Sequence, residues 1–374
     1  MKYNKVVILT INKFDRRDFF RFGIDGFLRK DIKAEIYDLT PFLRTTDYLK
    51  TYNPPEEIKD DYVFKVNNLV ELKCLLESNS NDSTFIICYI TLYQKTEKIF
   101  QLLSALHFKY GVYRMALPDL RPLYKQILSR LRFLIKYNLI VRNIEPAAIV
   151  LYAGYQTRFQ NSSKISNKTV KVDVGSPDFN KYRELEKNGV NRIGDPEIVF
   201  IDEYYPLHPD LENERFIDPE FYYQSVNFFL RKVAEKYNMS CGIAVHPRAN
   251  YFEKNPFEFK LYYNQTAELI YNSKIVIGHA STAFSYAVLG NKPIIQLGFK
   301  QTSDHFYGKV LKSFSNQLGL KTCFLDHSYT LPNLKINNKK YKKYIYNYLI
   351  VNRAIGITDA NTIFLNFILN DPDS

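Results

Sequence analysis

The feature that most constrains the fold of this chain is the order of its segments between residues 243 and 297. Short apolar runs rich in β-branched residues lie at 243–245, 275–277 and 293–296. One segment with the apolar spacing of a helix lies between each run and the next. Strands that alternate with helices predict an α/β fold with a parallel sheet.

Polar residues follow two of these predicted strands at once. His246, Pro247 and Arg248 come after the first strand, and the sequence Gly-His-Ala-Ser-Thr at 278–282 comes after the second. In a parallel α/β sheet, ligands bind outside the carboxyl ends of the strands. We therefore expect both clusters to lie at the ligand-binding edge of the sheet.

The second cluster has the composition of an anion site. Ser281 or Thr282 can cap a following helix, whose free N–H groups attract negative charge. Gly278 permits close backbone approach, and His279 can donate to a phosphate oxygen. Arg248, predicted to come from a neighbouring strand end, can hold the same group. These residues predict a site for a nucleotide phosphate.

This arrangement resembles the C-terminal nucleotide-binding domain of bacterial GT-B glycosyltransferases. The likeness rests on His246-Pro247, on the Ser281-Thr282 pair that opens a helix, and on the run Ala-Val-Leu-Gly-Asn-Lys-Pro-Ile-Ile at 287–295. It covers residues 195–325, and it is greatest for the sialyltransferase-like and Kdo-transferase-like enzymes of capsule and lipooligosaccharide synthesis. Their corresponding motifs hold a CMP-sugar.

The resemblance implies a GT-B architecture, in which two Rossmann-like domains face a central cleft and a C-terminal helix crosses back. Predicted strands near 5–10, 34–39, 84–90, 112–116 and 147–154 are consistent with a first domain of this kind. We assign residues 1–185 to an acceptor-side domain, 196–335 to a nucleotide-sugar-binding domain and 336–374 to a helical tail that packs toward the first domain. The polar segment 181–197 is the candidate linker.

Transfer of a sugar requires a base for the acceptor hydroxyl and donors for the departing phosphate. His246, Arg248, His279, Ser281 and Thr282 are the candidates for the phosphate. The related families place their base in an acidic triplet ending in glycine, which this chain lacks. Its nearest counterparts are Asp173, with Gly175 close by at the end of a predicted strand, and Asp25-Gly26. Asp202 and Glu203 end the first predicted strand of the second domain and are expected to face the cleft as well. Structural alternatives stay open, because Asp202 also suits a solvent-exposed turn and His246 a loop held by backbone contacts.

The sequence gives no reason to expect a metal or a cofactor. Its four cysteines are widely spaced, and the only Asp-x-Asp match is Asp371-Pro372-Asp373 at the C-terminus. The glycine-rich signatures of dinucleotide-binding oxidoreductases and P-loop NTPases are absent, as is the Gly-x-Ser-x-Gly of serine hydrolases.

The net charge of +12 is compatible with nucleic acid, an anionic membrane surface or an anionic substrate. Residues 121–142 carry six basic residues and no acid, with Arg121, Lys125, Arg132 and Lys136 on one predicted helix face. This face suits lipid head groups, and it equally suits an ordinary surface helix. We expect no secretory leader, and no apolar run reaches 18 residues. We expect a cytoplasmic protein that contacts the inner membrane.

The predicted function is metal-independent transfer of a sugar, preferably a CMP-linked acidic sugar, to a surface glycan or lipid-linked glycan acceptor. The alternatives are a UDP-, GDP- or dTDP-linked donor and, from a different class, a non-catalytic protein that binds nucleic acid or another polyanion. Nucleic acid is not the expected partner, because the sharpest polar clusters lie at strand ends rather than on one basic, aromatic face.

Overall fold

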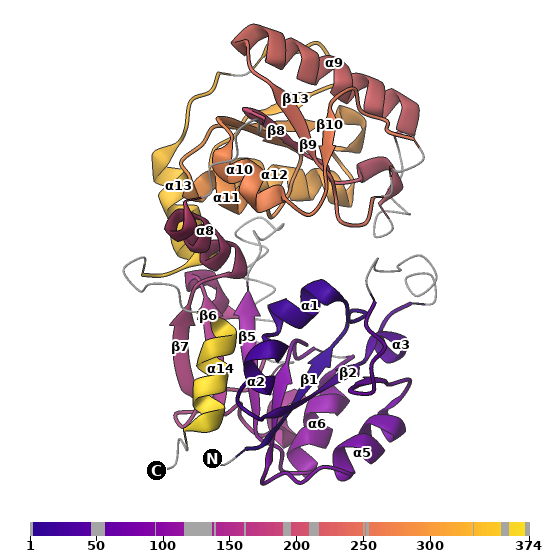
Figure 1. Ribbon diagram of the computed structural model, residues 1–374, viewed down its shortest axis with the longest axis vertical. Coiled ribbons are helices and arrows are strands. Elements are labelled where there is room, and N and C mark those ends of the chain that lie inside the picture. The colour runs from indigo at the N-terminus through magenta and orange to yellow at the C-terminus, as the bar shows by residue number, and fades with distance from the viewer. Residues whose placement is uncertain are drawn as a thin grey trace. The chain divides into compact units, whose positions relative to one another are not determined.

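The chain folds into two compact units in a computed structural model (Figure 1). Unit 1 comprises residues 1–116, 122–175 and 353–374, and unit 2 comprises residues 117–121 and 176–352. The structure describes residues 3–45, 57–93, 95–115, 137, 140–160, 162–189, 196–208, 217–249, 251, 254–331, 333–352 and 359–370.

Unit 1 is built on a parallel sheet of seven strands, in the order β3-β2-β1-β4-β5-β6-β7. The strands are β1 (Lys5–Thr10), β2 (Lys33–Asp38), β3 (Val63–Lys65), β4 (Thr84–Cys88), β5 (Tyr110–Met115), β6 (Ile149–Ala153) and β7 (Val170–Val174). Strand order reverses direction between β1 and β4, as in a Rossmann-like sheet. The predicted first domain is therefore α/β, with β3 as a short edge strand that the sequence pattern did not predict.

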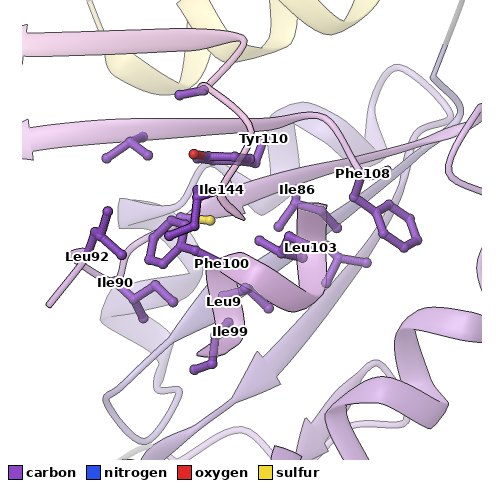
Figure 2. Close-up of a cluster of buried hydrophobic side chains, with 14 of the residues drawn as sticks. Leu9, Ile86, Ile90, Leu92, Ile99, Phe100, Leu103, Phe108, Tyr110 and Ile144 are labelled. Carbon is purple, nitrogen blue, oxygen red and sulfur yellow. The ribbon is translucent and has the colours of Figure 1, made fainter. Parts of the chain in front are cut away.

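Helices cover both faces of this sheet, so its central strands are apolar on both sides. One face packs against α5 (Leu69–Glu77) and α6 (Glu97–Ala105), where Leu9, Ile86, Phe100 and Leu103 meet (Figure 2). The other face packs against α1 (Arg16–Arg21), α2 (Ile24–Leu28) and α14 (Ala360–Leu369). A short helix, α3 (Thr40–Leu43), follows β2.

The last helix of the chain belongs to the first unit. Phe364 of α14 is fully buried in the unit 1 core. A Cβ atom on Gly111 of β5 would lie 2.6 Å from the Phe364 ring, so only glycine allows this close approach. Figure 1 shows α14 against this sheet, far in sequence from the strands that it covers. The expected return of the C-terminal helix is confirmed.

Unit 2 contains a second parallel sheet of six strands, in the order β10-β9-β8-β11-β12-β13. The strands are β8 (Ile198–Ile201), β9 (Cys241–Ala244), β10 (Lys260–Tyr262), β11 (Ile275–Gly278), β12 (Ile294–Gly298) and β13 (Thr322–Phe324). The helices are α8 (Pro177–Asn188), α9 (Pro219–Tyr237), α10 (Thr266–Asn272), α11 (Phe284–Leu289), α12 (Phe306–Leu318) and α13 (Asn338–Tyr344). Strand order reverses between β8 and β11, which makes their carboxyl ends the topological switch point.

The candidate linker at 181–197 is helical over its first half. Ser176 caps α8 by accepting a hydrogen bond from the Phe179 amide, and Pro177 occupies the first turn. Phe179, Tyr182 and Leu185 recur every three residues and are buried. This apolar face accounts for a helix where overall polarity favoured a linker.

Two features singled out in the sequence lie outside the described residues. They are most of the basic segment 121–142, including Arg121, Lys125, Arg132 and Lys136, and the terminal Asp371-Pro372-Asp373. Within the described ranges, no helix combines the length and the apolar character that crossing a membrane requires.

Candidate functional site

The polar clusters of unit 2 converge on the carboxyl end of β8. The parallel strands pair in the order β9-β8-β11, so β8 lies between the strand that leads to His246 and the strand that leads to His279. The expectation that these two clusters follow neighbouring strands is wrong. The residues that follow β8, Asp202 and Glu203, connect them instead.

Asp202 holds the loop that carries His246. One carboxylate oxygen accepts the Tyr204 amide at 2.8 Å. The other accepts the His246 amide at 3.3 Å and the Tyr251 hydroxyl at 3.0 Å. Burial raises the pKa of Asp202 to about 6. With 2% exposure and donors on both oxygens, Asp202 is not the solvent-exposed turn acid considered above, and its catalytic role stays a prediction.

Glu203 reaches in the opposite direction, to the turn after β11. Its Oε1 accepts the amides of His279 at 3.2 Å and Ala280 at 2.6 Å. Its Oε2 accepts the Tyr307 hydroxyl at 2.5 Å. Burial, reinforced by the nearby charge of Asp202, raises the pKa of Glu203 to about 7. A carboxylate of the protein itself thus occupies two backbone donors in the turn that was predicted to bind a phosphate.

His246 is half-buried and has a defined tautomer when neutral. Its Nδ1 accepts the Arg248 amide at 3.2 Å, so the neutral imidazole carries its proton on Nε2. The ring lies edge-on to that of His208, with 5.0 Å between ring centroids. Arg248 is also half-buried. A fixed ring with an N–H donor suits contact with an anionic group.

The structure gives His279 a different place from the one expected. Its ring is fully buried, with Nε2 within 2.9 Å of the Tyr222 hydroxyl and Nδ1 within 3.2 Å of the Leu297 carbonyl. Burial lowers the pKa of His279 to about 4, so the ring is neutral at pH 7. Both ring nitrogens have partners inside the protein. The side chain therefore has no nitrogen left for a phosphate oxygen.

Helix α11 starts later than expected, after a turn that runs from Gly278 to Ala283. Helix α11 starts at Phe284 and has no side-chain cap, so the predicted capping by Ser281 or Thr282 is wrong. Ser281 Oγ instead accepts the Ala283 amide at 3.2 Å inside the turn. A Cβ on Gly278 would lie 3.1 Å from the Phe284 ring, which accounts for glycine there.

Two backbone N–H groups of this turn, on Ser281 and Thr282, are candidates for contact with a ligand. Among the described residues, neither the Ser281 amide nor the Thr282 amide has a hydrogen-bond acceptor. Ser281 is half-buried and Thr282 is exposed. Consecutive N–H groups in a turn form a concave site for anions.

The remaining candidate base lies in unit 1. Asp173, on β7, forms an ion pair with Arg158, with 2.5 Å between Oδ2 and the guanidinium nitrogen. Asp25, considered beside it in the sequence, pairs with Arg29 at 2.9 Å. Neither carboxylate belongs to the network in unit 2.

Sequence reasoning missed the tyrosines that complete the network. Tyr251 and Tyr307 hold the two carboxylates, and Tyr204 has a left-handed backbone with a φ of 52°. Such a conformation is strained in a residue with a large side chain and is concentrated at functional sites. No spacing distinguishes these residues among the 30 tyrosines of the chain. Among the described residues, no group of three His, Cys, Asp or Glu side chains could hold a metal.

The raised pKa of Glu203 predicts a loss of stability as the pH rises. The unfolded chain releases this proton near pH 4.5 and the folded chain near pH 7, so the folded state binds more protons between these values. The contribution of Glu203 to the free energy of unfolding is fully present below pH 4.5 and is lost as the pH rises through 7. Its size is about 3 kcal/mol, at 1.36 kcal/mol per pKa unit. The raised pKa of Asp202 also lowers stability as the pH rises, whereas the lowered pKa of His279 increases stability as the pH rises.

Urea unfolding of the wild type and of Glu203→Gln between pH 4.5 and pH 8 isolates this contribution. The free energy of unfolding of the wild type, relative to that of Glu203→Gln, should decline by about 3 kcal/mol as the pH rises. Parallel pH profiles for the two proteins would contradict it.

No protein-family model and no curated protein sequence matches the chain. Among solved structures, a variant of the wall teichoic acid polymerase TagF matches with a TM-score of 0.52 and 11% identity, over 99% of this chain and 89% of that one. A second TagF variant matches with a TM-score of 0.53 and 9% identity, over the same shares. The chain has a GT-B fold.

The match to the TagF variant covers 99% of this chain, so the GT-B assignment rests on both sheets and not only on the motifs of unit 2. A UDP-GlcNAc 2-epimerase from Neisseria meningitidis also matches, with 13% identity over 98% of this chain and 99% of that one. Its TM-score of 0.45 is too low to add to the GT-B assignment. At these identities the comparisons establish the fold alone.

Proposed function

We propose that this chain is a glycosyltransferase that moves a sugar from a nucleotide-activated donor to a surface glycan or lipid-linked glycan acceptor. The observation that carries the proposal is the convergence of the His246 loop and the 278–283 turn at the switch point of unit 2. Open α/β sheets bind nucleotides at this position. The GT-B fold, which the chain shares with a polymerase of a cell-surface polymer, supports the same reaction class.

The donor phosphate would be held by four residues. The amides and hydroxyls of Ser281 and Thr282 supply neutral donors, and Arg248 supplies charge. His246 Nε2–H would donate to the phosphate as the bond to the sugar breaks, when negative charge on the leaving group increases. Gly278 permits the close approach of the turn.

Asp173 remains the proposed base. It lies beside Arg158, and a carboxylate is a group that accepts a proton from an acceptor hydroxyl. From the sequence we assign residues 1–185 to the acceptor side, 196–335 to the donor side and 336–374 to the returning tail; the two compact units divide the chain differently, because residues 176–185 and 336–352 belong to unit 2. The proposal places the reaction in the cytoplasm, at the inner membrane surface, and uses no metal.

The favoured donor is a CMP-linked acidic sugar, and a UDP-, GDP- or dTDP-linked sugar is the alternative. Both would place a phosphate at the 278–283 turn. They differ in base and in the number of phosphate groups. A nucleotide screen therefore tests the proposal and selects between its forms.

We expect one of CMP, UDP, GDP and dTDP to raise the melting temperature, because a ligand that binds only the folded state stabilises it by mass action. At about 100 times its Kd the ligand adds about 2.7 kcal/mol. The matching nucleoside serves as the control for a phosphate-dependent effect. No shift with any of the four at about 1 mM would contradict the transferase.

A further inference from the structure

The N–H groups of the turn after β11 fall into two pairs. The first pair, on His279 and Ala280, donates to one oxygen of Glu203. The second pair, on Ser281 and Thr282, has no acceptor among the described residues. Of four successive backbone N–H donors, two are therefore occupied by a carboxylate of the protein itself.

Glu203 is fixed in this position from several sides. The Tyr307 hydroxyl, from α12, holds its second oxygen at 2.5 Å. The neighbouring Asp202 carboxylate is held in turn by Tyr251 and by backbone amides. His279 turns its ring away, toward Tyr222. The carboxylate cannot leave the turn without breaking three hydrogen bonds.

We propose that Glu203 is a specificity-determining residue that restricts the site to donors with a single phosphate group. This inference rests on the proposed function. One phosphate would bind the amides of Ser281 and Thr282. A second phosphate, which the same turn would otherwise accommodate, would have to compete with Glu203 for the amides of His279 and Ala280.

Charge adds to this competition above pH 7, where the Glu203 carboxylate is ionised. A sugar linked through one phosphate carries one negative charge at the linkage, and a sugar linked through a diphosphate carries two. Like charges disfavour each other most where burial limits screening by water and salt. Glu203 and Asp202 lie at the same strand end, so an extra phosphate would enter a place that already holds two acids.

The experiment measures the Kd of CMP and of CDP by calorimetry at about pH 8, where Glu203 is ionised, for the wild type, Glu203→Gln and Glu197→Gln. Glutamine keeps an oxygen that can accept from the turn but removes the charge. Glu197 is the matched control, because it lies at the other end of β8 and likewise contacts a backbone amide, that of Ser240, together with Lys274. CMP should bind the wild type at least tenfold more tightly than CDP. Glu203→Gln should reduce that preference at least tenfold, and Glu197→Gln should leave it unchanged.

Several results would overturn the inference. Equal affinity of the wild type for CMP and CDP would do so without any variant. If Glu203→Gln weakens both nucleotides by the same factor, Glu203 acts only by positioning the turn. The failure of every nucleotide to bind the wild type would instead reject the proposed function, and this inference with it.

Discussion

His246→Ala is expected to lower turnover by about 100-fold or more, the scale of losing one donor to a developing anion. The Asp202 carboxylate holds the His246 backbone, and the Arg248 amide holds its Nδ1. These contacts orient the ring, and the neutral imidazole carries its proton on Nε2. Since Asp202 contacts the backbone amide, the substitution leaves that anchor in place. The fold should therefore survive.

Single-turnover rates with the nucleotide-sugar identified by the screen measure this effect. His327→Ala is the control, because this histidine lies in the same unit as His246 and its side chain is 53% exposed. Its Nδ1 lies 3.9 Å from Asp326 Oδ1. It should react at the wild-type rate. Near-normal turnover of His246→Ala with a lowered melting temperature would assign His246 a structural role instead.

Asp202→Ala is expected to reduce the free energy of unfolding by about 3 to 5 kcal/mol. Three donors lose their acceptor: the amides of Tyr204 and His246 and the hydroxyl of Tyr251. A buried donor without a partner costs about 1 to 3 kcal/mol, and water can re-enter beside some of the three. The left-handed backbone of Tyr204 also loses the contact that holds it.

Urea unfolding measures the loss, and Tyr251→Phe gives a graded comparison. That variant removes one donor while Asp202 keeps its two amides, so it should cost about 1 kcal/mol. A loss below about 1 kcal/mol for Asp202→Ala would mean that the carboxylate is not the anchor of the strand ends.

Much of the fold could be predicted because its signals are local. Helix α9 (Pro219–Tyr237) carries its start signals within the segment itself, with Asp218 as a cap and Pro219 in the first turn. The strand expected at 275–277 is observed as β11 (Ile275–Gly278). β-branched runs between turn residues define such strands without reference to the rest of the chain.

The site was harder to predict because it depends on strand order. Consecutive strands suggest neighbours, yet β8 inserts between β9 and β11 and makes Glu203 the contact of the turn. The burial of His279 against Tyr222 joins residues 57 positions apart, which no local pattern contains. The late start of α11 reflects a turn in which Ser281 bonds to its own backbone rather than capping the helix.

Calorimetry on Ser281→Ala/Thr282→Ala tests most directly whether this turn holds a nucleotide phosphate. The substitutions remove two hydroxyls and leave the amides, so binding of the nucleotide should weaken by about 1 to 3 kcal/mol, the range for hydrogen bonds to charged groups. Binding of the corresponding nucleoside, which has no phosphate, should be unchanged. If nucleotide and nucleoside lose the same affinity, the phosphate does not bind at this turn and the proposed donor site is wrong.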